Sequence, residues 1–108
     1  MKNNNLGKKD VLPLLRKELP YLKEKYGVKR MALYGSFALG VADGKSDVDI
    51  LVDLSRPLGF EFVALADHLE SKLGRRVDVA TFKTLNHSLH NARYRPIART
   101  IRKTLIHV

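Results

Sequence analysis

Two aspartates separated by a single residue are the side chains of this sequence whose spacing first suggests chemistry. Asp47 and Asp49 open a run of apolar, mostly β-branched residues. Side chains at positions i and i+2 of a strand project from the same face, so the two carboxylates belong together, about 7 Å apart at their backbones. Asp78 lies within another short apolar run. If the two strands are neighbours, the three carboxylates form one cluster.

Such a cluster predicts a metal site, because bare carboxylates repel one another. Two of them about 5 Å apart cost about 3 kcal/mol at an effective dielectric constant near 20. A divalent cation removes that cost, and an all-oxygen donor set suits Mg²⁺ with retained waters and phosphate oxygens. We expect Asp47, Asp49 and Asp78 to bind Mg²⁺, with two ions as the arrangement that clamps both oxygens of a phosphoryl displacement. Asp53 shares the face of Asp49 but is expected to be an ordinary acid at the strand end.

Gly35 and Ser36 form the complementary half of a nucleotide site. They follow an apolar run that ends at Tyr34 and precede an expected helical turn. Glycine allows the backbone to approach a phosphate closely, and amide groups at the start of a helical turn face an anion. The serine hydroxyl adds a donor. We expect these two residues to hold phosphates while the aspartates hold the metal.

Apolar periodicity predicts the elements that position these residues. The first is a helix that Asp10 caps and Gly27 ends, kinked or divided at Pro20, because a proline in a helix interior removes a hydrogen bond. A second helix is expected from Pro57 to Gly74, with apolar residues along one face. Strands are expected at residues 29–34, 47–53 and 76–81, with a helical turn at 36–40, a loop at 41–46, a loop that holds Asn86, His87, His90 and Asn91, and a basic helix from Pro96 to about Leu105.

The order of these elements predicts a mixed α/β or α+β fold, with a small sheet of three to four strands flanked by helices. The chain of 108 residues, 44% of them hydrophobic, suits a single domain over residues 10–108 after a flexible tail over residues 1–9. It contains no cysteine, which excludes disulfides and thiolate chemistry. The first residues are polar and no apolar run could span a bilayer, so we expect a cytoplasmic protein.

The formal net charge of +9 favours anionic partners. The stretch from Arg93 to Lys103 contains no acidic residue, and Glu70 and Asp78 are the last two acids of the chain. A solvated basic face is the simpler interpretation, because no helix-turn-helix, zinc-finger or aromatic stacking motif accompanies the charge. A nucleic-acid binder is the alternative, and it requires an affinity that falls steeply with salt.

Gly-Ser, ten further residues and then Asp-x-Asp together resemble the pattern of the DNA polymerase β-like nucleotidyltransferase superfamily, and in particular its minimal nucleotidyltransferase branch. Gly35, Ser36, Asp47, Asp49 and Asp78 occupy the five positions of that pattern. The likeness covers roughly residues 20–82 well and the C-terminal helix loosely. It implies the nucleotidyltransferase fold and transfer of AMP from ATP with Mg²⁺. Asp78 would bind the second metal ion and help to activate the acceptor hydroxyl.

The resemblance also implies a partner. Many stand-alone proteins of this branch are antitoxins that transfer AMP to a tyrosine of a HEPN-domain toxin, so a hetero-oligomer is expected. Leu39 departs from the family, whose members often carry Arg there to meet the phosphates. Lys45 or Arg30 is expected to substitute, or else nucleotide binding is weakened. The alternative is a non-catalytic nucleotide-binding antitoxin that neutralises its partner by occlusion.

Several other polar side chains have simpler interpretations. Asp78 could pair with Arg75 or Arg76 instead of a metal. His68 is expected on the solvent side of its helix, and His87 and His90 on a surface loop. The tyrosines expected to pack in or against the core are Tyr21, Tyr26 and Tyr34.

Overall fold

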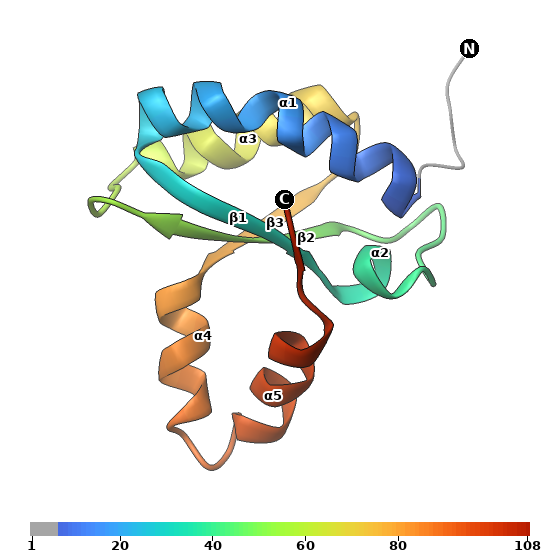
Figure 1. Cartoon of the computed structure of the whole chain (residues 1–108), viewed down its shortest axis with the longest axis vertical. Coiled ribbons are helices and arrows are strands. Elements are labelled where there is room, and N and C mark those ends of the chain that lie inside the picture. The colour runs from blue at the N-terminus through green and yellow to red at the C-terminus, as the bar shows by residue number, and fades with distance from the viewer. Residues whose placement is uncertain (1–6) are drawn as a thin grey trace.

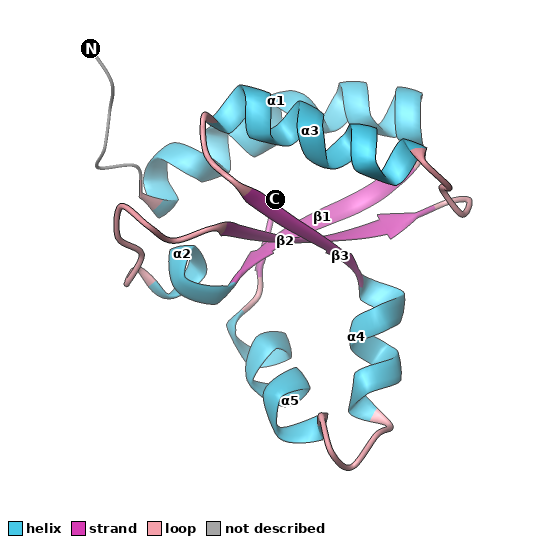
Figure 2. Ribbon diagram, turned by 180° about the vertical axis from the view of Figure 1, so that it is seen from behind, coloured by secondary structure: helices cyan, strands magenta, loops and turns pink. Residues whose placement is uncertain are grey.

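A four-stranded mixed sheet lies between two layers of helices in the computed structural model, which describes residues 7–108 (Figure 1). Helices α1 and α3 cover one face of the sheet, and α4 and α5 lie against the other (Figure 2). In chain order the elements are α1 (Lys8–Tyr26), β1 (Val28–Tyr34), α2 (Gly35–Leu39), β2 (Val48–Leu54), α3 (Glu61–Leu73), β3 (Val77–Thr81), α4 (Phe82–Leu89), α5 (Arg95–Thr104) and β4 (Ile106–His107). This is the mixed α/β architecture predicted from the sequence.

The strand order is β3-β2-β1-β4. β1 pairs antiparallel with both β2 and β4, whereas β2 and β3 run parallel. Parallel neighbours need a crossover connection, and α3 provides it. The two strands that carry the predicted aspartates are therefore adjacent.

Alternate residues of each strand enter two different cores. Val48, Ile50 and Val52 of β2 point towards α1 and α3 and belong to the larger hydrophobic cluster. Leu51 points the other way and packs with Phe82 of α4 in a smaller cluster. Asp47, Asp49 and Asp53 alternate with the first set, so they share the α4–α5 face.

The N-terminal helix differs from its prediction in its cap and its continuity. Gly7 is the cap residue, and Asp10 lies in the first turn, where its carboxylate accepts a 2.9 Å hydrogen bond from Gly7 N. The predicted cap at Asp10 is wrong, and the helix runs as one element through Pro13 and Pro20. Both prolines are exposed while the opposite side is buried, so packing outweighs the hydrogen bonds that the prolines remove. Residues 1–6 of the tail predicted over residues 1–9 lie outside the described residues, and Lys8 and Lys9 belong to α1 instead of the tail.

The helix predicted to start at Pro57 begins later, at Glu61. Residues 57–60 form an irregular turn that contains Gly59, and glycine disfavours a helix there. The predicted apolar face is confirmed, because Leu65, Leu69 and Leu73 are buried. Gly74 ends the helix in the left-handed conformation, as predicted.

Two C-terminal elements were not predicted. The expected loop after β3 contains helix α4, whose N-cap Thr81 accepts a 3.1 Å hydrogen bond from Thr84 N. The signal was present in the sequence, since Phe82, Leu85 and Leu89 recur at helical spacing. The short strand β4 follows α5 and pairs with Ala32 and Leu33 of β1.

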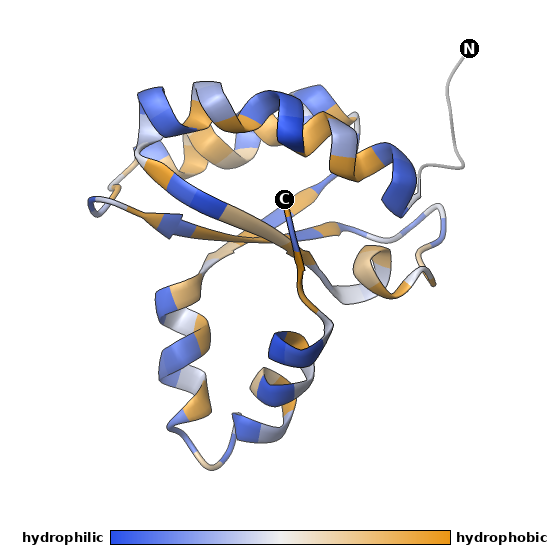
Figure 3. Cartoon of the chain, in the orientation of Figure 1, coloured by the Kyte–Doolittle hydropathy of each residue, from blue (hydrophilic) through white to orange (hydrophobic). Residues whose placement is uncertain are grey.

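Hydrophilic residues cover much of the outward surface of the helices (Figure 3). Over residues 7–108, no helix combines the length and the apolar character needed to cross a bilayer.

Candidate active site

The parallel pairing of β2 and β3 places two predicted site residues side by side. Asp49 and Asp78 are direct partners in the strand register. Parallel neighbours lie about 4.8 Å apart, and partners in register point to the same face. Asp47 precedes β2 by one residue and shares this face. The sequence predicts a three-carboxylate cluster only if the strands of Asp49 and Asp78 are neighbours, and the structure meets that condition.

Gly35 brings the start of α2 directly against Asp49. Its φ of 73° is in the left-handed region, and the space where a Cβ would stand is occupied by the Asp49 carboxylate. Tyr34, the residue before it, pairs with Asp49 across β1 and β2. Only glycine allows both the backbone conformation and the close approach. The predicted phosphate-binding Gly35 and Ser36 thus lie beside the predicted metal-binding carboxylate.

Negative charge accumulates at this corner of the sheet. Burial, reinforced by the carboxylates of Asp78 and Asp47, raises the pKa of Asp49 to about 6. Burial and the charges of Asp49 and Asp78 likewise raise the pKa of Tyr34 to about 12. Carboxylates that destabilise one another's ionised forms create a site that favours a cation.

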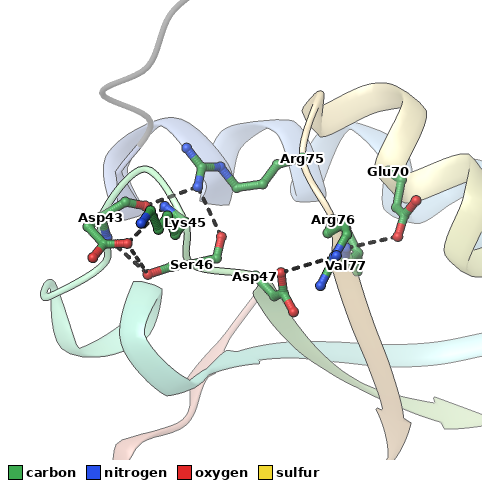
Figure 4. Close-up of polar contacts among 8 residues, drawn as sticks. All are labelled: Asp43, Lys45, Ser46, Asp47, Glu70, Arg75, Arg76 and Val77. Carbon is green, nitrogen blue, oxygen red and sulfur yellow. Dashed lines mark hydrogen bonds and ion pairs between the residues drawn. The ribbon is translucent and has the colours of Figure 1, made fainter.

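The two arginines before β3 are engaged elsewhere than at Asp78 (Figure 4). Arg76 Nε lies 3.5 Å from Asp47 Oδ1, in a pair exposed enough to add little stability. Arg75 Nη1 donates hydrogen bonds of 3.0 Å to the backbone oxygens of Asp43 and Ser46. Within residues 7–108 neither arginine forms an ion pair with Asp78, so that alternative is not borne out.

The loop that leads to Asp47 is organised by its own hydrogen bonds (Figure 4). Asp43 Oδ1 accepts from Lys45 N at 2.9 Å and from Ser46 Oγ at 3.2 Å, and these bonds lower the pKa of Asp43. The Arg75 guanidinium adds the two carbonyl contacts and also lies 5.4 Å from the ring centre of Phe37 in α2. Arg75 therefore links the loop to the element that carries Ser36. Sequence reasoning did not identify this role.

The three carboxylates are the right type of ligand for a divalent cation, but their positions do not converge on one point. Hard divalent ions take oxygen donors, and three carboxylates share one face here. Yet among residues 7–108, no three His, Cys, Asp or Glu side chains stand close enough together to enclose an ion. Asp47 is drawn towards Arg76, while Asp49 rests against Gly35. The expected convergence on one point is therefore not present, and metal binding would require Asp47 to turn from Arg76.

The candidate substitutes for the family arginine have different surroundings. Leu39 ends α2 and is 55% exposed. Arg30 lies at the far end of β1 from Gly35, where its Nε is 3.2 Å from Asp53 Oδ2 and its guanidinium lies 4.1 Å from the Phe82 ring centre. It is thus already engaged away from the cluster. Lys45 is exposed on the loop before Asp47 and is the better placed of the two.

The histidine predictions were partly wrong. His68 is largely buried between α1 and α3, where its Nε2 lies 2.7 Å from Glu18 Oε1 and its ring stacks on Tyr21. It faces the neighbouring helix because α1 covers that side of α3. His87 and His90 are exposed as expected, but His87 lies within helix α4 and His90 is its C-cap. Of the tyrosines, Tyr26 is buried and Tyr34 half-buried, while Tyr21 packs against both Tyr26 and His68 at the surface.

Comparison with known proteins identifies the family. The nucleotidyltransferase domain family matches residues 15–105. A putative protein adenylyltransferase of Methanocaldococcus jannaschii is 37% identical over 92% of this chain and 95% of its own length. The protein adenylyltransferase MntA of Thermococcus cleftensis is 35% identical over 81% of each chain.

A solved structure shares the fold. A crystal structure of a mutant toxin–antitoxin complex, MntA-HpeT, aligns with a TM-score of 0.54 and 20% identity, over 92% of this chain and 84% of that one. The strand arrangement that brings Asp49 beside Asp78, together with relatives that match nearly the whole chain, leads to one conclusion: the protein belongs to the nucleotidyltransferase domain family.

Proposed function

We propose that this nucleotidyltransferase uses Mg²⁺ to transfer AMP from ATP to a protein acceptor, and that it acts as the antitoxin of a HEPN-type toxin. The observation that carries the proposal is the in-register pair Asp49 and Asp78, with Gly35 packed against Asp49. The relatives named protein adenylyltransferases support a protein as the acceptor. The toxin–antitoxin complex of the same fold, together with the MntA relative, supports the antitoxin role.

Each residue of the predicted set has a role in this proposal. Asp47 and Asp49 would hold Mg²⁺, and Asp78 would hold a second ion and accept the proton of the acceptor hydroxyl. Bound Mg²⁺ would supply neutralisation of the phosphate charge. Gly35 and Ser36 would hold the β- and γ-phosphates, which leave as pyrophosphate when the bond between the α- and β-phosphates breaks and the acceptor oxygen bonds to the α-phosphate. Catalysis would then come from positioning and charge stabilisation, as in other phosphoryl and nucleotidyl transfers.

The test is transfer of label from α-³²P-ATP, with Mg²⁺, to a HEPN-domain partner co-expressed with this chain. Asp49→Asn is expected to abolish labelling of the partner while the protein remains folded. Asp53→Asn is the matched control, since Asp53 lies on the same strand and face but pairs with Arg30. Transfer by the Asp49→Asn variant at the native rate would refute the mechanism.

The second candidate is an antitoxin that binds nucleotide without turnover and occludes its partner. Two observations favour it: Leu39 in place of the usual arginine, and the absence, within residues 7–108, of a preformed three-carboxylate metal site. An Asp47→Asn/Asp49→Asn double variant separates the two. Continued neutralisation of the toxin by this variant supports occlusion, and loss of neutralisation with the complex intact supports transfer.

A further inference from the structure

A small apolar cavity opens on the carboxylate face of the sheet, between α4 and α5. Its volume is about 180 Å³. Tyr34, Leu51 and Ala80 contribute to it from β1, β2 and β3, and residues of α4 and α5 form its walls. The space is large enough for one bulky side chain.

The cavity adjoins the candidate active site on the same face of the sheet. Leu51 follows Asp49 by two residues on β2, and Ala80 follows Asp78 by two on β3, so each cavity residue lies about 7 Å along the same face from a carboxylate. Tyr34 lines the cavity and is also the strand partner of Asp49. A group held here would present its neighbours directly to Asp49 and Asp78.

The walls of the cavity are suited to an apolar occupant. The hydroxyl of Thr84 lies 3.0 Å from Thr81 Oγ1, and Ser88 Oγ donates to Thr84 O at 3.1 Å, so both are already engaged. Leu85, Ala98 and Ile101 complete the lining with apolar surface. A nucleobase site needs directional polar groups that are free to read the base edge. Apart from the hydroxyls of Tyr34 and Tyr94, the lining offers few such groups, so it favours an aliphatic or aromatic side chain over a base.

The mouth of the cavity carries exposed apolar side chains. Tyr94 is 47% exposed and Ile97 is 63% exposed, and both line the cavity. Apolar residues around a pocket that accepts an anchor are characteristic of protein interfaces. Ile97 offers a nucleobase no hydrogen-bonding group, whereas it can pack against an apolar side chain of a protein partner.

The segment that forms the cavity walls is basic, although Arg95, Arg99 and Arg102 line a separate hollow beside α4 and α5. The chain from residue 79 onwards has no Asp or Glu, and its Lys and Arg residues are Lys83, Arg93, Arg95, Arg99, Arg102 and Lys103. The Arg93 guanidinium lies 5.7 Å from the ring centre of Tyr94, which places positive charge at the rim. Complementary charge steers association and suppresses wrong partners. An acidic segment is the matching surface.

We propose that this cavity is the docking site for the protein acceptor: it takes a large apolar side chain from an acidic segment that also carries the acceptor hydroxyl. The proposal rests on the proposed function, because it deepens the choice of substrate at the same site. Seating the anchor between α4 and α5 positions the neighbouring hydroxyl at Asp78. Acceptor specificity is then set by Tyr94 and Ile97, which do not touch the nucleotide.

The test compares two exposed aliphatic residues on opposite faces of the sheet. Ile97 is changed to Glu and to Lys, and the matched control is Val63, 59% exposed on α3, changed in the same two ways. The probe is the HEPN-domain partner of the labelling experiment. Ile97→Glu is expected to raise the acceptor KM by at least about tenfold, because the apolar contact between Ile97 and the docked side chain is lost and the new carboxylate repels the acidic segment. Ile97→Lys should raise it less, and both Val63 variants should leave it unchanged.

ATP binding measured without the partner separates the alternatives. It should be the same in the wild type and in both Ile97 variants. Reduced ATP affinity in these variants would overturn the proposal in favour of a nucleobase pocket. An acceptor KM that is unchanged in the Ile97→Glu variant would overturn the proposal that the cavity docks the acceptor. An Ile97→Lys variant that raises the KM as much as Ile97→Glu would overturn the proposal that the docked segment is acidic. If the wild type transfers no label, the proposed function fails, and calorimetric titration of the partner then tests docking alone, with the same expected ranking of variants.

Discussion

At the scale of single residues, the site is defined by carboxylates held against backbone and against one another. Asp49 is enclosed by Gly35 on one side and by Asp78 on the next strand, with Asp47 and Tyr34 close by. Its raised pKa, about 6, reflects first its burial and then the two neighbouring carboxylates. Ionisation at this position therefore costs the folded protein free energy.

That cost predicts a pH-dependent effect of removing the charge. The pKa of Asp49 rises from 3.8 to about 6 on folding, so its favourable contribution is present below about pH 4 and is lost as the pH rises through 6. Without added metal, Asp49→Asn should exceed the unfolding free energy of the wild type by only about 0.3 kcal/mol at pH 4.5 and by about 1 kcal/mol at pH 7.5, after allowance for solvent screening. Urea titrations at both pH values measure this. Asp67→Asn on α3 is the control, and equal stability at pH 7.5 would contradict the predicted shift.

Two glycines allow the contact at Gly35 to be tested separately from its backbone conformation. Gly35 and Gly40 have φ values of 73° and 77°, but only a Cβ at Gly35 would collide with Asp49, since nothing lies within 4 Å of one at Gly40. Gly40→Ala should cost about 1 kcal/mol of stability for its left-handed conformation. Gly35→Ala should cost about 1–3 kcal/mol more, because the carboxylate must move, and it should also abolish transfer. Equal losses in urea unfolding would show that Asp49 does not pack on Gly35.

At the scale of elements, the position of Asp47 depends on a loop fixed from outside. Arg75 follows α3, yet its guanidinium binds the carbonyls of the loop between α2 and β2 and lies over Phe37. One side chain thus connects the turn after α3, the loop before β2 and helix α2. The loop's own hydrogen bonds from Asp43 complete the arrangement.

Loss of Arg75 should therefore loosen the loop more than the fold. Arg75→Ala removes two charge-assisted hydrogen bonds, so we expect the free energy of local opening of this loop to fall by about 1–2 kcal/mol. Limited trypsin cleavage after Lys45 measures this opening, and Arg75→Lys should restore part of the protection. Arg76→Ala is the control, because it removes only an exposed pair with Asp47. Equal cleavage of the two alanine variants would contradict a clamping role for Arg75.

The elements also show how far the sequence alone could lead. The central strands and the Gly35 turn were predicted because apolar runs, β-branched in β2 and β3, and glycines reflect local geometry directly. Which strands lie side by side was not predicted, because the pairing of Asp49 with Asp78 depends on α3 crossing over the sheet. Asp47 was expected to converge with the other aspartates, but its contact with Arg76 depends on tertiary placement that residue spacing does not encode. Helix α4 was missed because the polar residues Asn86 and His87 within it, and His90 and Asn91 after it, hid the apolar spacing of Phe82, Leu85 and Leu89.

At the scale of the whole molecule, the net charge is positive, but the candidate site is locally negative. The chain carries a net charge of +9, while the cluster of Asp47, Asp49 and Asp78 concentrates negative charge at one corner of the sheet. The basic C-terminal helices lie on the same side as that cluster. Such a face combines a corner whose charge favours a cation with a surface suited to acidic partners, as the proposed transfer to an acidic acceptor would need.

Because negative charge is concentrated in this cluster while the net charge of the protein is positive, we predict that divalent cations stabilise the folded protein by binding at the cluster and not at other surface sites. A ligand that binds only the native state at about 100 times its Kd adds about 2.7 kcal/mol. Saturating Mg²⁺ should therefore raise the Tm of the wild type at pH 7.5 by several degrees, and Asp49→Asn and Asp78→Asn should each remove most of the increase. Asp53→Asn should retain it, because Asp53 pairs with Arg30 beyond the cluster. If the Tm increase persists in Asp49→Asn, the ion binds elsewhere on the protein. If Mg²⁺ does not raise the Tm of the wild type, with or without ATP, the cluster binds no metal, and occlusion is favoured over transfer.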